Sequence, residues 1–429
     1  MENEIGKIIE QNLENEDNEE GRKTNDEGWE DVEGTDANGE DTRTILEEYK
    51  LWRKNCTYMY SYVSETALIW PSLSVDFVKS NTYENKTKDD KFGVVRNLLL
   101  TTFTSGEDEE YVKIASLKLP RLLTDDKDMT REELQTVDSR LKISKKFKTD
   151  VEINKVRACP SDNHIFAMID GNGKVYIYKL DSKMQVEFTK ELVHHKENGF
   201  GICWNPTNSN QLATCSEDGD AVIWDIEQGK PISIFRDHNG LFVNDVRFSI
   251  DGERLVTVGE DKRIIVRDLV EGKIINFAEA PCTLNTATFS PFTKNLLAVG
   301  GENGNVFIYD TGNMKLLHTL VGHTKSVTNV EWDPFHHNII GSCSIDRRVI
   351  LWDLEKIGEE QTAEESEDGV PELLMMHGGH TGGVNDFSFS KEIPWCVASC
   401  SDDNVVHVWG VHPHIIKEPV ITVSDSVLE

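Results

Sequence analysis

Six side chains have the types and the spacing of a hydrolytic triad that occurs twice. They are His323, Ser342 and Asp346 and, at the same intervals, His380, Ser399 and Asp403. In such a triad the imidazole takes the proton of the hydroxyl while the carboxylate orients the ring, which is the chemistry of acyl transfer. An active site occurs once in a chain, whereas a structural brace recurs with every repeated unit. We therefore expect hydrogen-bonded braces, and a chain that is not an enzyme.

The repeated unit is clearest between Gly322 and Leu354, which opens on Gly-His and closes on Trp-Asp. This frame within 40 to 45 residues is the signature of a four-stranded propeller blade. An Asp or Asn stands six residues before the aromatic position of the closing strand in six successive segments. The pairs are Asn172 and Tyr178, Asp218 and Trp224, Asp261 and Arg267, Asn303 and Tyr309, Asp346 and Trp352, and Asp403 and Trp409.

One blade cannot bury its own apolar faces, but blades stacked around an axis can. A degenerate first blade between about Phe92 and Lys148 brings the total to seven. We expect an all-β, seven-bladed propeller over residues 67–412, followed by a tail at 413–429. The last interval between blades is longer than the others because of an acidic insertion at 358–372, and insertions in repeat arrays often carry binding.

Charge limits the class of partner. The formal net charge is -31 and the pI is about 4.8. Contacts to nucleic acid need a basic surface, so we expect no direct nucleic-acid binding and a basic partner instead. Acidity that serves only solubility is an equal alternative.

The eight cysteines show no metal-binding spacing, and no glycine-rich phosphate loop is present. We expect reduced core cysteines, no metal, no cofactor, no membrane span, and a location in nucleus and cytoplasm.

The chain begins with a strongly acidic segment. Residues 1–41 contain 16 acidic and 3 basic side chains with little apolar pattern, which predicts a disordered tail over 1–43. The tail is either an electrostatic lure for basic partners or a solubilising segment.

A helix over residues 44–66, docked on the propeller, is predicted next. Thr44 and Glu47 have capping-box spacing, and apolar residues recur every three or four positions from Ile45 to Val63. Large residues near its end cover more than one face, and this surplus either waits for a partner or packs internally. The alternating stretch Leu73 to Phe77 is predicted to be the strand that completes the last blade.

A second register marks the channel. Four residues before the aromatic of each innermost strand stand mostly amides, which could hold an extended peptide or merely satisfy loop backbone. These residues are Asn154, Phe200, Asn244, Asn285, Thr328 and Asn385.

The repeat resembles the WD40 family over roughly residues 70–411. Three stretches narrow the resemblance: EEYKLWRKN from Glu47, WPSL from Trp70, and the run from Lys356 through EDGVPEL to HGGH at His380. They resemble the histone-binding proteins of the retinoblastoma-binding and MSI type, and within them the regulatory subunits of fungal type B histone acetyltransferases.

The resemblance implies two binding sites. A histone H4 helix would lie between the N-terminal helix and the acidic insertion, on Tyr58, Met59, Tyr62, Glu364, Glu365, Glu367, Asp368 and Met375. A histone H3 tail would lie on the channel face, on Trp70, Glu152, Asn154, Asn198, Phe200, Asn244, Asn285, Thr328, Asn385 and Asp402. Asn198 and Asn244 stand where relatives tend to carry Glu, and Thr328 where an aromatic is usual, which should weaken an arginine-containing tail.

The expected function is therefore presentation of histone H4 to a catalytic acetyltransferase subunit. Relatives of this type also act as histone chaperone subunits in chromatin assembly and deacetylase complexes, which is the main alternative. A substrate receptor of a ubiquitin ligase is a weaker one, because WD40 receptors carry Arg two residues after the blade-ending Asp. Those positions hold Glu227, Val270, Gly312 and Glu355.

Overall fold

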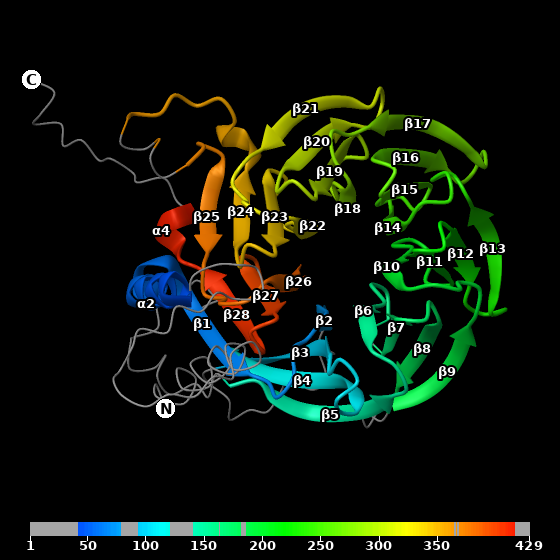
Figure 1. Ribbon diagram of the computed structural model, residues 1–429, viewed down its shortest axis with the longest axis horizontal. Helices are drawn as coiled ribbons and strands as arrows, with labels where there is room; N and C mark the ends of the chain where they lie inside the picture. The colour runs from blue at the N-terminus through cyan, green and yellow to red at the C-terminus, as the bar shows by residue number, and fades with distance from the viewer. Residues whose placement is uncertain are drawn as a thin grey trace, which may run out of the picture.

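The computed structural model describes residues 42–78, 93–120, 140–162, 164–181, 186–363, 366 and 369–416. Seven four-stranded antiparallel sheets surround a central channel as the blades of a propeller (Figure 1). The predicted fold class is confirmed.

Six blades are built from consecutive strands that run from the channel outward. Blade 1 contains β2 (Val75–Val78), β3 (Gly93–Thr101), β4 (Glu110–Pro120) and β5 (Lys142–Thr149). Blade 2 contains β6 (Ile153–Ala158), β7 (Ile165–Asp170), β8 (Val175–Leu180) and β9 (Val186–Leu192). Blade 3 contains β10 (Gly199–Trp204), β11 (Gln211–Ser216), β12 (Ala221–Asp225) and β13 (Lys230–Phe235). Blade 4 contains β14 (Val243–Phe248), β15 (Arg254–Gly259), β16 (Arg263–Asp268) and β17 (Lys273–Glu279). Blade 5 contains β18 (Leu284–Phe289), β19 (Leu296–Gly301), β20 (Val306–Asp310) and β21 (Lys315–Leu320). Blade 6 contains β22 (Val327–Trp332), β23 (Ile339–Ser344), β24 (Val349–Asp353) and β25 (Leu373–His377), with the 3-10 helix η2 (Leu354–Lys356) after β24.

The seventh blade joins the two ends of the described chain. It contains β26 (Val384–Phe389), β27 (Cys396–Ser401) and β28 (Val405–Val411), and β1 (Tyr60–Ala67) pairs with β28 as its outer strand. The prediction that residues 73–77 complete this blade is wrong, because β2 is the innermost strand of blade 1. Without β1, the edge of β28 would be left unpaired, so the segment nearest to it closes the ring.

The N-terminal helix is shorter than predicted. Helix α2 spans Thr42–Met59, so it begins two residues earlier than the expected 44 and ends well before 66. From Tyr60 onward the buried residues alternate instead of recurring every three or four, because aromatic and β-branched residues fit the strand that β28 requires. The segment after the propeller also differs from a plain tail, since its first residues form helix α4 (Pro413–Ile416). Residues 1–41, most of the predicted tail, lie outside the described residues.

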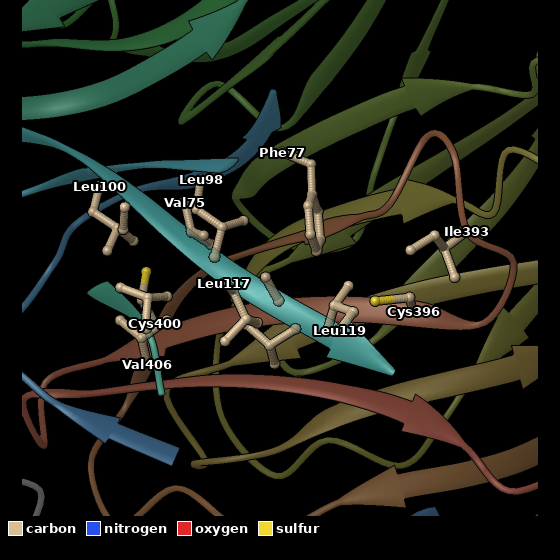
Figure 2. Close-up of a cluster of buried hydrophobic side chains, with 14 of the residues drawn as sticks. Val75, Phe77, Leu98, Leu100, Leu117, Leu119, Ile393, Cys396, Cys400 and Val406 are labelled. Atoms are coloured by element: carbon tan, nitrogen blue, oxygen red, sulfur yellow. The ribbon is translucent and has the colours of Figure 1, made fainter. Parts of the chain in front are cut away.

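The core lies between the blades. Where blade 1 meets blade 7, Val75, Phe77 and Leu98 pack with Cys396 and Val406 in one buried cluster (Figure 2). This contact seals the ring at the point where it closes. All eight cysteines are free thiols, as expected. No helix among the described residues is long and apolar enough to cross a membrane.

The repeated His, Ser and Asp residues form braces inside the blades. The His323 Nε2 atom lies 2.8 Å from the Ser342 hydroxyl and its Nδ1 atom 2.9 Å from Asp346, while the Trp352 indole N–H donates to the same hydroxyl. The His323 side chain has 0% exposed surface, so no substrate can reach this hydroxyl. His195 with Thr214 and His238 with Thr257 repeat the arrangement in other blades. The brace interpretation fits this geometry and the triad interpretation does not.

Candidate functional site

Helix α2 is docked on blades 6 and 7 by a chain of buried hydrogen bonds. The Trp52 indole N–H donates to the Tyr60 hydroxyl at 2.8 Å, and this hydroxyl lies 2.7 Å from Nδ1 of His377. His377 Nε2 is in turn 2.9 Å from Nδ1 of His407 on β28. Burial first, and then the neighbouring His380, hold the pKa values of His377 and His407 well below the usual range. Both rings are therefore neutral, and each can accept a hydrogen bond at Nδ1.

Two ion pairs add to this anchor. Glu48 accepts hydrogen bonds from Arg347 at 3.1 Å and from Arg348 at 2.5 Å, both on the turn before β24. Arg53 donates to both oxygens of Glu65 on β1 at 2.7 and 2.8 Å. The position of α2 on the ring is thus fixed by polar contacts as well as by the buried stripe of Ile45 and Trp52.

The apolar residues predicted for histone H4 separate into surface and support. Tyr58 is 70% exposed, whereas Tyr62 and Met375 are 8% and 3% exposed and belong to the core. Met59 is half-buried and packs beside Met375. Tyr62 and Met375 therefore hold the wall from behind, and only Tyr58 and part of Met59 present a surface.

One residue of this surface, Leu51, was not predicted from the sequence, and it is 59% exposed. Leu51 and Tyr58 are seven residues apart on α2, so they lie on one face of the helix, and this spacing was the signal that could have identified the pair. Leu374, Ile415 and Ile416 are half-buried against the cluster that also contains Met59. Helices α2 and α4 and the segment between η2 and β25 lie on the same side of the ring (Figure 1).

The four acidic residues predicted for the histone H4 site, Glu364, Glu365, Glu367 and Asp368, lie outside the described residues. They belong to the insertion whose described part includes a hydrogen bond from the Gln361 amide to the carbonyl of Gly369.

The residues predicted for the channel face occupy one structural position. Each is the second residue of an innermost strand, where the pairing with the next strand shifts register at a β-bulge. A bulge takes its extra residue out of the ladder and re-aims the side chain. Five of the six side chains donate a hydrogen bond to a backbone carbonyl of the next blade along the chain or, for blade 7, to the segment before β2. The pairs are Asn154 with Gly199, Asn244 with Leu284, Asn285 with Val327, Thr328 with Val384, and Asn385 with Ser72.

These bonds join blade to blade, which is the structural alternative for the register. They also leave the amide oxygens: no described residue donates a hydrogen bond to Oδ1 of Asn154, Asn244 or Asn285. Phe200 forms no such bond, and its ring is 37% exposed. The channel mouth therefore presents acceptors and one exposed aromatic, which suits a cationic peptide.

The structure adds carboxylates at the channel mouth that were not predicted from the sequence. One residue before the repeated Asp or Asn, the backbone N–H donates to a carbonyl just before the innermost strand, at Glu217, Glu260, Glu302 and Asp402. Only Asp402 was predicted, although the same register would have identified all four. Burial raises the pKa of Glu217, and the nearby carboxylates of Glu197 and Glu260 raise it further. A cation among these groups would relieve their repulsion.

In blade 2 the corresponding position is Gly171, where an added Cβ would lie 2.5 Å from a carboxylate oxygen of Glu152. The predicted Glu152 thus fills the space that a side chain at 171 would take. Asn198 accepts a hydrogen bond from Asn154 at 2.6 Å, and the Trp70 indole donates to Asp108 at 3.2 Å. Both predicted residues are therefore held by neighbours within the chain.

Three buried histidines have nitrogens close enough to suggest a metal site. The ligand atoms of His377, His380 and His407 lie within 4.8 Å of one another. His377 uses both nitrogens in the hydrogen-bond chain, and His380 Nε2 lies 2.8 Å from the Ser399 hydroxyl. The rings of His380 and His407 are stacked at 4.2 Å, so their in-plane lone pairs do not converge on one point. The arrangement fits a hydrogen-bonded anchor better than an ion site.

Comparison with known proteins agrees with this division into a helix and a ring. Residues 47–121 match the family model for histone-binding protein RBBP4 and its counterpart in the CAF1 complex, and residues 187–225, 229–268, 314–353 and 371–410 match the WD domain, G-beta repeat. The chain is 38% identical to histone acetyltransferase type B subunit 2 of Debaryomyces hansenii, over 90% of this chain and 95% of that protein. Proteins of the same name from Candida albicans and Schizosaccharomyces pombe are 37% and 35% identical, over 90% of this chain and 98% and 95% of their own lengths. The chain therefore belongs to the WD-repeat family of histone acetyltransferase type B subunit 2 proteins.

Proposed function

We propose that this chain is a non-catalytic, histone-binding subunit of a type B histone acetyltransferase, which presents histone H4 to the catalytic subunit. The observation that carries the proposal is the exposed pair Leu51 and Tyr58 on an α2 that is locked to the ring, on the same side as the acidic insertion. An amphipathic helix binds by its apolar face, and a basic one gains from nearby carboxylates. The resemblance to histone-binding proteins implies that the first helix of histone H4 is such a ligand.

The four acidic residues of the insertion remain part of this proposed site, although the structure does not describe them. Histone H3 is the proposed ligand of the channel mouth, where amide oxygens and the carboxylates of Glu217 and Glu260 face a cationic tail. These carboxylates offset the Glu residues that positions 198 and 244 lack. We place the protein in the nucleus, with a cytoplasmic pool that meets newly made histones, and we expect no direct binding of nucleic acid.

A pull-down of purified core histones with the full chain tests the proposal directly. The double variant Leu51→Ala, Tyr58→Ala should lose at least about tenfold in affinity for histone H4, because two large apolar contacts are removed. A matched control removes two equally exposed apolar side chains from outer strands, Ile232→Ala and Phe277→Ala, which are 50% and 59% exposed. Equal losses in both variants would contradict the proposed site.

A second arm separates the two faces. Phe200→Ala should weaken capture of a histone H3 tail peptide and leave histone H4 binding intact. Phe200 is preferable to Asn154 as a probe because it holds no hydrogen bond between blades. Loss of both ligands in this variant would mean that the channel mouth and the α2 face are not independent sites.

The kinetic consequence of presentation is a tethering effect. With the catalytic subunit, the chain should lower the apparent KM for whole histone H4 far more than it changes kcat, since it adds binding away from the reacting group. A short tail peptide without the first histone helix should show no such gain. Equal stimulation of both substrates would instead indicate allosteric activation of the enzyme.

A further inference from the structure

The outer strand of blade 1 is unlike the other outer strands. Strand β5 reads KISKKFKT and carries four lysines in eight residues. The outer strands β9, β13, β17 and β21 each carry one lysine, and β25 and β1 carry none. A single lysine is enough to keep an edge strand from pairing with other chains, so edge protection does not explain four.

The lysines of β5 also face another lysine. Lys146 on β5 is directly opposite Lys113 on β4, and like charges opposite each other destabilise a sheet. Burial lowers the pKa of Lys113, and the charge of Lys146 lowers it further. This repulsion is left in place in a chain whose net charge is -31.

Acidic neighbours cover the lysines only in part. Lys148 pairs with Glu109 at 2.7 Å, and the Lys146 ammonium lies 4.4 Å from the centre of the Tyr111 ring. No described carboxylate forms an ion pair with Lys113, Lys145 or Lys146, and Glu110 and Asp108 act on Lys113 and Lys146 only at longer range. We call Lys113, Lys145, Lys146 and Lys148 the lysine surface.

We propose that the acidic segment before α2, residues 1–41, binds the lysine surface of its own chain. Its 16 acidic and 3 basic residues supply the complementary charge. The geometry permits the contact: α2 runs directly into β1, and the Leu141 N–H at the start of β5 donates to the Thr66 hydroxyl near the end of β1. A random coil of this length has a root-mean-square reach of about 35 Å, which is comparable with the radius of a propeller.

This contact gives the acidic segment a defined role. The lysine surface is the place on an otherwise acidic protein where a polyanion could bind, and a tethered competitor occupies it at high effective concentration. The segment therefore protects the protein from polyanions and is released in their presence at low salt only when they are abundant.

The test uses the full chain and a zero-length carbodiimide cross-linker, which joins carboxylates to lysines in direct contact. Cross-links from residues 1–41 should concentrate on the lysine surface. They should be rare at Lys230, Lys273 and Lys315, which are the exposed lysines of β13, β17 and β21. Equal cross-linking of both lysine sets would overturn the proposal. Cross-links to the lysine surface that come instead from Asp125 to Glu133 would assign it to the β4 to β5 connection and would also overturn it.

A binding assay with a fluorescent heparin oligosaccharide gives an independent readout. Full-length protein in which the acidic residues of 1–41 are changed to their amides should bind heparin about tenfold more tightly at low salt, and the gain should vanish at high salt. Adding Lys113→Gln, Lys145→Gln and Lys146→Gln should abolish the gain, whereas Lys230→Gln, Lys273→Gln and Lys315→Gln should not. An unchanged heparin affinity, or abolition by the control set, would refute the contact.

Discussion

Tyr60→Phe is the sharpest test of how α2 is held on the ring. The substitution keeps the ring, which packs against Trp52 and Trp409, and removes only the hydroxyl. Two partners then lose their hydrogen bonds in a buried site: the Trp52 indole N–H, now at 2.8 Å from the hydroxyl, and His377 Nδ1 at 2.7 Å. Each unpaired buried polar group costs about 1–3 kcal/mol, so the free energy that keeps α2 docked should fall by about 2–5 kcal/mol.

Hydrogen exchange of the α2 amides measures this docking directly, because a local opening exposes them without unfolding the blades. A loss of about 2 kcal/mol corresponds to roughly 30-fold faster exchange in α2, with little change in blades 3 and 4. The control is Tyr58→Phe, whose ring is 70% exposed and whose removal of a hydroxyl should change exchange by less than about twofold. If Tyr60→Phe exchanged at the same rate as the control, the chain of hydrogen bonds would not be what holds the helix. Histone H4 binding should weaken in parallel with the exchange, since the proposed site requires a docked α2.

Three further outcomes follow from named contacts. Because His377 and His407 have lowered pKa values in the fold, the unfolded chain binds more protons below about pH 6.5; stability is full above that pH and should fall below it by about 1.4 kcal/mol per pH unit for each ring, seen as a lower urea midpoint at about pH 5.5 than at about pH 7.5. His407→Gln should flatten this slope, and an unchanged slope would exclude the pair as its source. Glu48→Gln should cost about 1–3 kcal/mol by weakening two charged hydrogen bonds to arginines, measured by the same urea titration. Asn285→Ala should lower the stability by about 1 kcal/mol through loss of the bond between blades 5 and 6, and a neutral result would mean that solvent replaces it.

The parts of the fold that repeat could be predicted from the sequence, since each repeat checks the others. The Asp or Asn register located the turn of every later blade, and His323 with Ser342 and Asp346 was correctly interpreted as a brace because it recurs. The carboxylate register was equally available: Glu217, Glu260 and Glu302 each stand one residue before an aligned Asp or Asn. These carboxylates belong to turns and not to the innermost strands, so a pattern confined to the strands does not include them.

The parts that occur once could not be predicted in the same way. The segment 60–67 contains Tyr60, Tyr62 and Val63, which satisfy a helical spacing and a strand alternation about equally well, so local pattern does not decide between them. The decision comes from β28, at the far end of the chain, whose outer edge needs a partner. Helix α2 must therefore end at Met59, and this ending sets Tyr60 between Trp52 and His377. The same long-range pairing that misled the sequence interpretation is thus what creates the anchor for the helix, and a binding surface built on that helix depends on the closure of the ring.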